Sequence, residues 1–172
     1  MVDVIVVGGG HAGCESALAT ARLGLETVLF SLDKNWIASM PCNPSIGGPA
    51  KGVVVREIDA LGGQMGISAD ATALQFKMLN TTKGPGVRSL RVQSDKIAYK
   101  KYMQNVLANQ KNLTVREAVV EKVLANDNKI DGVLFVGGVL SKKRLGALSE
   151  MARQLHIKAL TIPSIGDFLT GR

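Results

Sequence analysis

A glycine-rich hexapeptide near the start of the chain constrains the fold more than any other feature. It reads Gly8-Gly9-Gly10-His11-Ala12-Gly13. Residues 4–7, directly before it, form a continuous β-branched apolar run, which is typical of a central parallel strand covered on both faces. After it, apolar residues recur at helical spacing over residues 14–23, and Gly24 can adopt the left-handed conformation that ends a helix. The glycines therefore stand between a strand and a helix.

In that context the pattern G-x-G-x-x-G predicts a dinucleotide-binding turn. Gly8 permits a tight turn, Gly10 lets the backbone approach a pyrophosphate, and Gly13 lets the helix pack on the strand. The helix N-terminus adds unpaired N–H groups and the positive end of a dipole. A ribose-binding carboxylate is expected about 20 residues further on, where the chain offers Ser31 or, slightly later, Asp33.

The remaining pattern predicts one α/β unit that spans residues 1–172. We expect a Rossmann-like parallel sheet with flanking helices and a β-hairpin or meander. A second strand is expected over residues 27–30, a structured loop over 40–52 and a short helix over 54–61 that ends at Gly62-Gly63. Residues 64–94 show no clean periodicity, so no element is predicted there.

The second half of the chain predicts two more helices and a hairpin. The first helix covers residues 95–109 and has Asp95 as its N-cap. Its predicted inward face carries Ala98, Tyr102 and Val106. Two β-rich runs, 119–124 and 130–135, flank a turn and resemble a hairpin. Residues 141–154 have the pattern of an amphipathic helix.

Composition constrains the size, charge and cellular location of the protein more than its function. The chain has 172 residues, 46% of them hydrophobic, which is enough for one domain with its own core. The net charge of +7 favours an acidic partner such as nucleic acid and also suits a merely soluble protein. No apolar run is long enough to span a bilayer and the N-terminus lacks a basic signal region, so a cytoplasmic location is expected. Two cysteines predict neither a disulfide framework nor a metal site.

Several segments beyond the glycine turn resemble the MnmG (GidA) family of tRNA-modifying flavoproteins over about residues 2–136. The segments are Cys42-Asn43-Pro44-Ser45-Ile46-Gly47-Gly48, Ala50-Lys51-Gly52, Arg56-Glu57-Ile58-Asp59-Ala60-Leu61-Gly62-Gly63, Gln75-Phe76, Leu79-Asn80, Lys83-Gly84-Pro85, Gln93, Asp95-Lys96 and Asn112-Leu113. This set of segments is far more specific than the glycine pattern alone.

The resemblance implies an FAD-binding enzyme that acts with a GTPase partner, MnmE. Together they would add a (carboxymethyl)aminomethyl group to C5 of the wobble uridine of tRNA, with methylenetetrahydrofolate as carbon source and NADH as reductant. Family members are several times longer, so the resemblance implies an incomplete FAD-binding domain that is inactive alone, with homodimer formation left open. The alternatives are a noncatalytic nucleotide-binding remnant and a generic FAD- or NAD-dependent oxidoreductase.

The resemblance also implies roles for particular residues. Gly8 to Gly13 would hold the FAD pyrophosphate, and Val120 would contact the adenosine half. The loop with Asn43, Gly47 and Gly48 would approach the isoalloxazine. Cys42 would act as a nucleophile or proton carrier, or would be a small packing residue. Cys14, inside the first helix, is expected to pack, and His11 is expected to be part of the turn without an acid–base role.

Basic residues gather between residues 77 and 101. They are Lys77, Lys83, Arg88, Arg91, Lys96, Lys100 and Lys101. Such a cluster would neutralise tRNA phosphates or form an ordinary solvated face. The chain departs from the family pattern at five positions: Pro41, Val53, Ser89, Leu90 and Val92. Beyond about residue 137 the resemblance ends.

Overall fold

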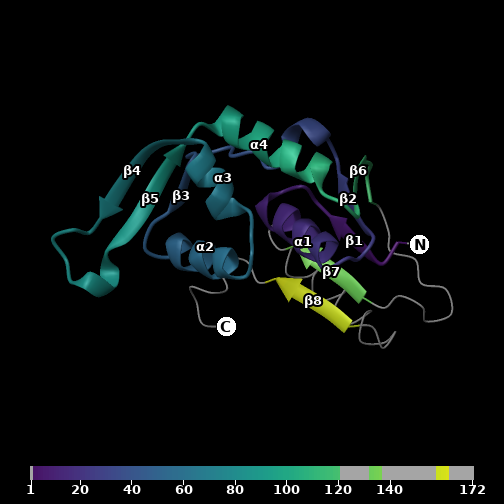
Figure 1. Cartoon of the computed structure of the whole chain (residues 1–172), viewed down its shortest axis with the longest axis horizontal. Helices are drawn as coiled ribbons and strands as arrows, with labels where there is room; N and C mark the ends of the chain where they lie inside the picture. Colours follow the sequence, from purple (N-terminus) through teal and green to yellow (C-terminus); the bar gives the residue numbers. More distant parts are fainter. Residues whose placement is uncertain (1, 121–131, 137–157, 163–172) are drawn as a thin grey trace.

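The computed structural model describes residues 2–120, 132–136 and 158–162, and these residues build two sheets with helices packed around them (Figure 1). A five-stranded sheet has the order β6-β2-β1-β7-β8, and a three-stranded sheet has the order β3-β5-β4. The predicted α/β class is confirmed. The three-stranded sheet was not expected.

The five-stranded sheet is the Rossmann-like part of the molecule. Its strands are β1 (Val4–Val7), β2 (Thr27–Ser31), β6 (Leu113–Glu117), β7 (Gly132–Val136) and β8 (Lys158–Ile162). Every neighbouring pair is parallel, with β1 between β2 and β7. Because parallel neighbours need a crossover, helix α1 (His11–Arg22) connects β1 to β2. The predicted parallel sheet is therefore confirmed.

Helix α1 covers one face of this sheet. Its buried positions include Cys14, Ala17, Leu18 and Ala21, which are the apolar positions that the spacing predicted. In β1, Val6 is fully buried, whereas Ile5 and Val7 are 53% and 41% exposed. The prediction that β1 is covered on both faces is wrong, because successive strand side chains point to opposite faces and α1 covers only one.

The three-stranded sheet is antiparallel and contains β3 (Ser45–Gly47), β5 (Ser89–Ser94) and β4 (Ala73–Leu79). Val92 lies opposite Ile46 on one side and opposite Phe76 on the other. Ile46 and Val92 are buried, whereas Phe76 is 56% exposed. Strands β4 and β5, together with the short helix η2 (Pro85–Val87) between them, project from the body (Figure 1). We call residues 73–94 the arm.

Two short helices lead into the arm. Helix α2 (Lys51–Ala60) begins three residues earlier than predicted, and helix α3 (Met65–Ala71) was not predicted. Within the loop predicted over residues 40–52, Ser45–Gly47 form β3 because they pair with β5. That pairing involves a strand more than 40 residues further along the chain, which local sequence does not reveal.

Helix α4 (Lys96–Asn109) follows the arm and is capped as predicted. The Asp95 carboxylate accepts hydrogen bonds from the N–H groups of Ile97 and Ala98, at 2.8 and 3.0 Å. The buried side chains are Tyr99, Met103 and Leu107. The predicted inward positions Ala98, Tyr102 and Val106 are only partly buried. The predicted face is wrong by one residue, because Tyr99 instead of Tyr102 turns its ring into the core.

Two predictions lie wholly or mainly outside the described residues. The helix over residues 141–154 is one, and the proposed hairpin turn around residues 126–128 is the other. Of the hairpin, Val119 and Val120 are described and form no strand, while β7 pairs in parallel with β1 and β8. Among the helices that the structure describes, none is long and apolar enough to cross a membrane.

Candidate functional site

The glycine turn connects β1 to α1 and is held in place by backbone hydrogen bonds and close packing. Gly8 has a φ of +105°, a conformation that favours glycine, and its N–H donates to the carbonyl of Phe30 at 2.8 Å. A side chain at Gly13 would collide with the carbonyl oxygen of Gly8. The first and last glycines of the pattern therefore serve the turn and the close approach of helix to strand.

Gly10 has a different environment. It is the N-cap of α1 with φ −72° and ψ −179°, and a Cβ added there would meet no atom within 4 Å. No side chain caps the helix, and its first turn holds no acidic residue. The leading N–H groups of α1 thus present a positive dipole end beside open space, which is the arrangement that binds a phosphate group.

Gly9 fixes the turn against two other segments. Its carbonyl accepts a hydrogen bond from the N–H of Ala38 at 2.9 Å. A Cβ at Gly9 would lie 2.6 Å from Ile37 Cγ1 and 3.0 Å from Ser31 Oγ. The end of β2 and the chain that leads to Cys42 therefore both lie directly against the glycine turn.

The two candidates for the ribose-binding position are both engaged within the protein. Ser31, at the end of β2, is buried and its Oγ donates to the carbonyl of Asp33 at 3.1 Å. The Asp33 carboxylate accepts from the N–H of Asn35 at 2.7 Å and caps the short helix η1 (Lys34–Trp36). Ser31 is the candidate that touches the glycine turn, whereas Asp33 shapes the loop.

Glu117 is a carboxylate that sequence reasoning missed. It lies opposite Ser31 at the end of β6, and its Oε2 accepts from the N–H of Lys34 at 3.1 Å. Carboxyl ends of parallel strands meet at one edge, where ligands bind in open α/β sheets. The N–H of Ala118 donates to the carbonyl of Ser31 at 2.9 Å, which brings Val120, two residues on, to the same edge.

His11 faces the core with an unpartnered atom. Its ring packs edge-on against Tyr99, with centroids 5.7 Å apart. Its Nδ1 and the Tyr99 hydroxyl are buried without a hydrogen-bond partner among the described residues. Burial, and secondly the positive charge of Lys51, hold the pKa of His11 below its ordinary value. Lys51, at the start of α2, thus adds positive potential beside the turn and was missed as a site residue.

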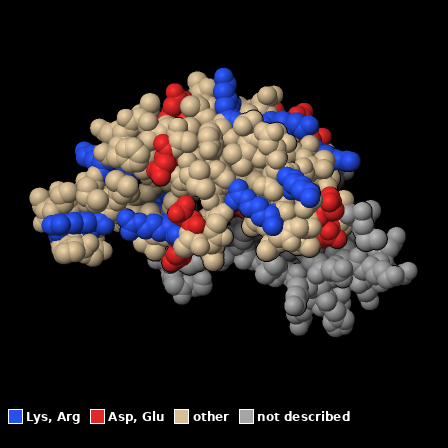
Figure 2. All heavy atoms as spheres, in the orientation of Figure 1, with Lys and Arg blue, Asp and Glu red and all other residues tan. Residues whose placement is uncertain are grey.

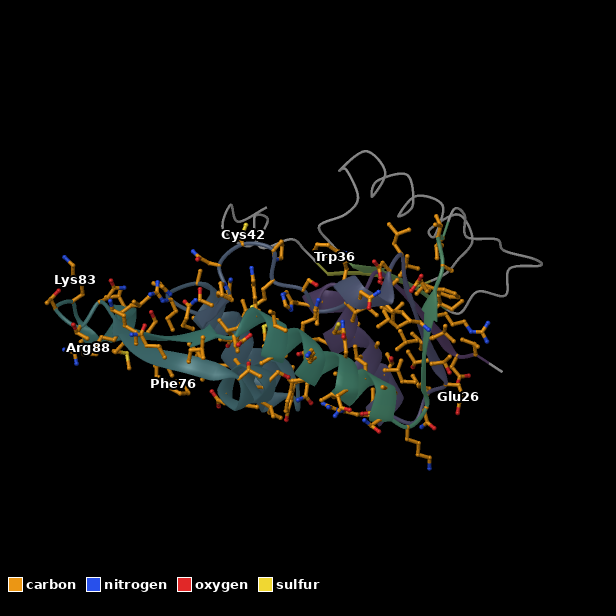
Figure 3. All side chains as sticks on the ribbon, turned by 90° about the horizontal axis from the view of Figure 1, so that it is seen from above. Glu26, Trp36, Cys42, Phe76, Lys83 and Arg88 are labelled. Atoms are coloured by element: carbon orange, nitrogen blue, oxygen red, sulfur yellow. The ribbon has the colours of Figure 1, made fainter. Side chains whose placement is uncertain are left out.

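The two cysteines differ. Cys14 is fully buried, its thiol contacts the carbonyl of Gly9 at 3.6 Å, and burial with the nearby Glu15 carboxylate raises its pKa to about 12. A thiol of that pKa stays protonated near neutral pH, so Cys14 is a packing residue. Cys42 is exposed on the loop before β3, and Figure 3 shows it on the opposite side of the chain from Phe76.

The loop after Cys42 is anchored at its far end. The carbonyl of Pro44 accepts from the N–H of Ser94, and the carbonyl of Asn43 accepts from the N–H of Ser45, both at 2.8 Å. Asn43 is exposed and Gly48 is buried. Gly47 has a φ of +105° and contacts the backbone of β5. The glycine turn and Cys42 are therefore joined by a short ordered stretch, residues 37–40, that packs on Gly9.

Comparison with known proteins agrees with this geometry. A family profile described as Glucose inhibited division protein A matches residues 3–147. The tRNA uridine 5-carboxymethylaminomethyl modification enzyme MnmG of Geobacillus thermodenitrificans is 58% identical over 136 residues, which are 79% of this chain and 22% of that protein. The chain thus spans about a fifth of the length of the curated relatives it matches.

Solved structures show the same similarity. Aquifex aeolicus GidA in its form II crystal superposes with a TM-score of 0.70 at 55% identity, covering 73% of this chain and 21% of that chain. PqsL of Pseudomonas aeruginosa, described as an FAD-dependent monooxygenase, shares the fold with a TM-score of 0.53 at 15% identity, covering 95% of this chain and 48% of that chain.

Proposed function

Because this chain belongs to the Glucose inhibited division protein A (GidA) family, we propose that it is the FAD-binding part of a tRNA-modifying enzyme. The complete enzyme would add a (carboxymethyl)aminomethyl group to C5 of the wobble uridine, with an MnmE-like GTPase, methylenetetrahydrofolate and NADH. The observation that carries the cofactor proposal is the uncapped first turn of α1 beside the open space at Gly10.

The residues present fit the pyrophosphate of FAD. Gly10 leaves room where any other residue would place a side chain, and the N–H groups of His11, Ala12 and Gly13 lead the helix. Lys51 adds a positive charge near His11. A dianionic pyrophosphate is stabilised by such donors and by the helix dipole, and no acidic side chain in the first turn opposes it.

The two ends of FAD would extend in opposite directions from the turn. Ser31 and Val120, at the carboxyl ends of β2 and β6, would hold the adenosine half. Asn43, Gly47 and Gly48, on the loop that the arm anchors, would approach the isoalloxazine. When bound, FAD supplies two-electron redox chemistry. This chain's residues bind and orient it.

Cys42, on the same loop, would act on the tRNA substrate. Its thiol is exposed two residues beyond Met40, which is itself buried against the core. An exposed thiol on an anchored loop can serve as nucleophile or proton carrier without moving the core. In a complete relative, Cys42→Ser should keep FAD bound and abolish tRNA modification. Unchanged modification would contradict a catalytic role for Cys42, and its exposure already argues against a packing role.

A second candidate function is a noncatalytic nucleotide-binding module. It is favoured by the exposed face of β1, where Ile5 and Val7 leave the sheet uncovered in the part of the chain that the structure describes. A module of this kind would bind the nucleotide half of the cofactor without enclosing a flavin. The third alternative, a generic oxidoreductase, would bind NAD at the same turn.

Flavin binding by the purified 172-residue chain tests the proposal. We expect FAD to bind with quenching of its fluorescence, and Gly10→Ala to raise the dissociation constant at least about tenfold while the fold is kept, since φ at Gly10 suits alanine. Gly84→Ala, at another open glycine, is the matched control. A folded chain that binds no FAD contradicts the cofactor proposal, and tight NAD binding instead would favour the generic oxidoreductase.

A further inference from the structure

A pocket separate from the glycine turn lies where Gly48 and the first turns of α2 meet η2 and the start of β5 at the tip of the arm. Its volume is about 200 Å³. It is lined by Gly48, Pro49, Gly52, Val53, Arg56, Gly86, Val87, Arg88, Ser89 and Leu90.

The pocket is positively charged. Arg56 from α2 and Arg88 from the arm both line it, and no acidic residue is among its described lining. The first turn of α2 has neither a side-chain cap nor an acidic residue, so its positive dipole end also faces this region. Two guanidinium groups and a helix N-terminus together favour an anion with several oxygen atoms.

A free hydroxyl adds a neutral hydrogen-bonding group. Ser89 lines the pocket, and its Oγ is buried without a hydrogen-bond partner among the described residues, so a ligand reaches the hydroxyl only after the side chain turns toward the pocket. A buried polar atom without a partner costs free energy unless a ligand or water satisfies it. Arginine forks and a hydroxyl match the oxygens of a phosphate group. The volume of about 200 Å³ is below the roughly 300–1,000 Å³ typical of sites that enclose a whole drug-sized molecule.

Positive charge continues from the pocket along the arm. Residues 73–94 contain Lys77, Lys83, Arg88 and Arg91 and no aspartate or glutamate. Lys77 and Arg91 lie directly opposite each other across β4 and β5. Like charges in this position destabilise a sheet, so their presence favours a polyanion that neutralises both. In the view of Figure 2 the outer arm carries Lys and Arg side chains and no acidic ones.

We propose that this pocket seats one phosphodiester of an RNA strand and that the cationic arm follows the neighbouring phosphates. The inference rests on the proposed function, because tRNA is the substrate named for the relatives, and it assigns a surface to that substrate. The proposal names the arm as the face that binds tRNA. It does not assign tRNA binding to the basic residues of α4, which are Lys96, Lys100 and Lys101. A nucleotide cofactor such as FAD carries phosphate groups too. The test therefore has to distinguish tRNA binding from FAD binding at this pocket.

Binding of a tRNA transcript to the 172-residue chain, followed by fluorescence anisotropy at several salt concentrations, tests the proposal. We expect Arg56→Gln and Arg88→Gln each to weaken tRNA binding by about fivefold or more at low salt. Each should also reduce the slope of log K against log salt by roughly 0.7, the value for one phosphate contact on a single strand. Lys101→Gln and Lys111→Gln, exposed and outside the arm, remove the same charge as controls and should change affinity less than about twofold.

Other outcomes would overturn the proposal. No tRNA binding by the wild-type chain would contradict the proposal outright, and equal losses in the arginine and control variants would leave only diffuse charge attraction. Weaker FAD binding with unchanged tRNA binding would assign the pocket to the cofactor. FAD is titrated into the same samples. A folded wild-type chain that binds no FAD would indicate failure of the proposed function, whereas FAD binding without tRNA binding would contradict only the RNA site. Arg56→Lys and Arg88→Lys keep the charge and the fold, and we expect them to recover part of the lost affinity, which decides the matter if a glutamine variant does not fold.

Discussion

The two sheets of this protein differ in how their surfaces are used. In the parallel sheet β2 is almost fully buried, and α1 packs so closely on β1 that Gly13 has no room for a side chain. In the arm, Leu74, Phe76 and Met78 are 71%, 56% and 48% exposed. The parallel part carries much of the core and the glycine turn, whereas the arm presents side chains outward.

The difference teaches that the two proposed binding regions depend on the core to different degrees. The N–H of Gly8 donates to the carbonyl of Phe30, the carbonyl of Gly9 accepts from the N–H of Ala38, and α1 packs on β1, so the geometry of the glycine turn depends on the core. The arm is attached to the body mainly through the pairing of β3 with β5 and through buried Val92. Substitutions of buried residues in the parallel part should therefore change folding, whereas substitutions of exposed arm residues should leave the fold intact.

The largest expected effect is from Gly13→Ala. The added methyl group would overlap the carbonyl of Gly8, so α1 must move away from β1. We expect a loss of about 4 kcal/mol or more in the free energy of unfolding, measured by urea denaturation. Gly84→Ala, in the arm turn with no atom near the added carbon, should change it by less than about 0.5 kcal/mol. Equal losses would show that the two regions are equally packed.

A second pair compares core and arm side chains directly. Leu29 in β2 is fully buried, and Met78 in β4 is 48% exposed. We expect Leu29→Ala to lower the free energy of unfolding by about 3 kcal/mol, because it leaves a cavity, and Met78→Ala to lower it by about 1 kcal/mol or less. Thermal melting of both variants checks this. A large loss for Met78→Ala would mean that the arm face is packed in solution.

The third prediction concerns pH. Since burial and Lys51 hold the pKa of His11 below 6.5 in the folded chain, the unfolded chain binds more protons between the folded pKa and 6.5. Stability should therefore fall as the pH drops below about 6.5. Between pH 7.5 and pH 5.5 the free energy of unfolding should fall less in the His11→Gln variant than in the wild type. The difference between these two losses should be smaller than the loss caused by Leu29→Ala. Identical pH profiles would contradict the burial of His11.

The smallest effect is expected from Lys77→Gln. Removing one of two like charges that face each other across β4 and β5 should raise the free energy of unfolding by roughly 0.3 kcal/mol at low salt. The gain should vanish at high salt, because exposed charges are screened. Thermal melting at two salt concentrations is the measurement. A destabilised variant would indicate that Lys77 has a partner within the fold.

Much of the parallel part was predictable from local sequence. The run before Gly8, the helical spacing of Cys14, Ala17 and Leu18, and the cap at Asp95 each act within a few residues, so pattern and propensity suffice. The arm was missed although Leu74, Phe76 and Met78 alternate with polar residues, because the apolar face of β4 is exposed and β3, its link to the core through β5, lies far away in the sequence. On α4, two overlapping apolar stripes are compatible with the spacing, and the packing of Tyr99 against His11 selected one.

The sequence by itself determined the strand–turn–helix, the glycine positions and the family. It also placed Cys42 and Asn43 on an ordered loop. Only the tertiary structure decided that Lys51 lies near His11, that Glu117 stands opposite Ser31, and that Arg56 and Arg88 share a pocket. The physical reason is distance along the chain. Turns and caps are set by neighbouring residues, whereas these groups meet only after strands and helices far apart in sequence have packed together.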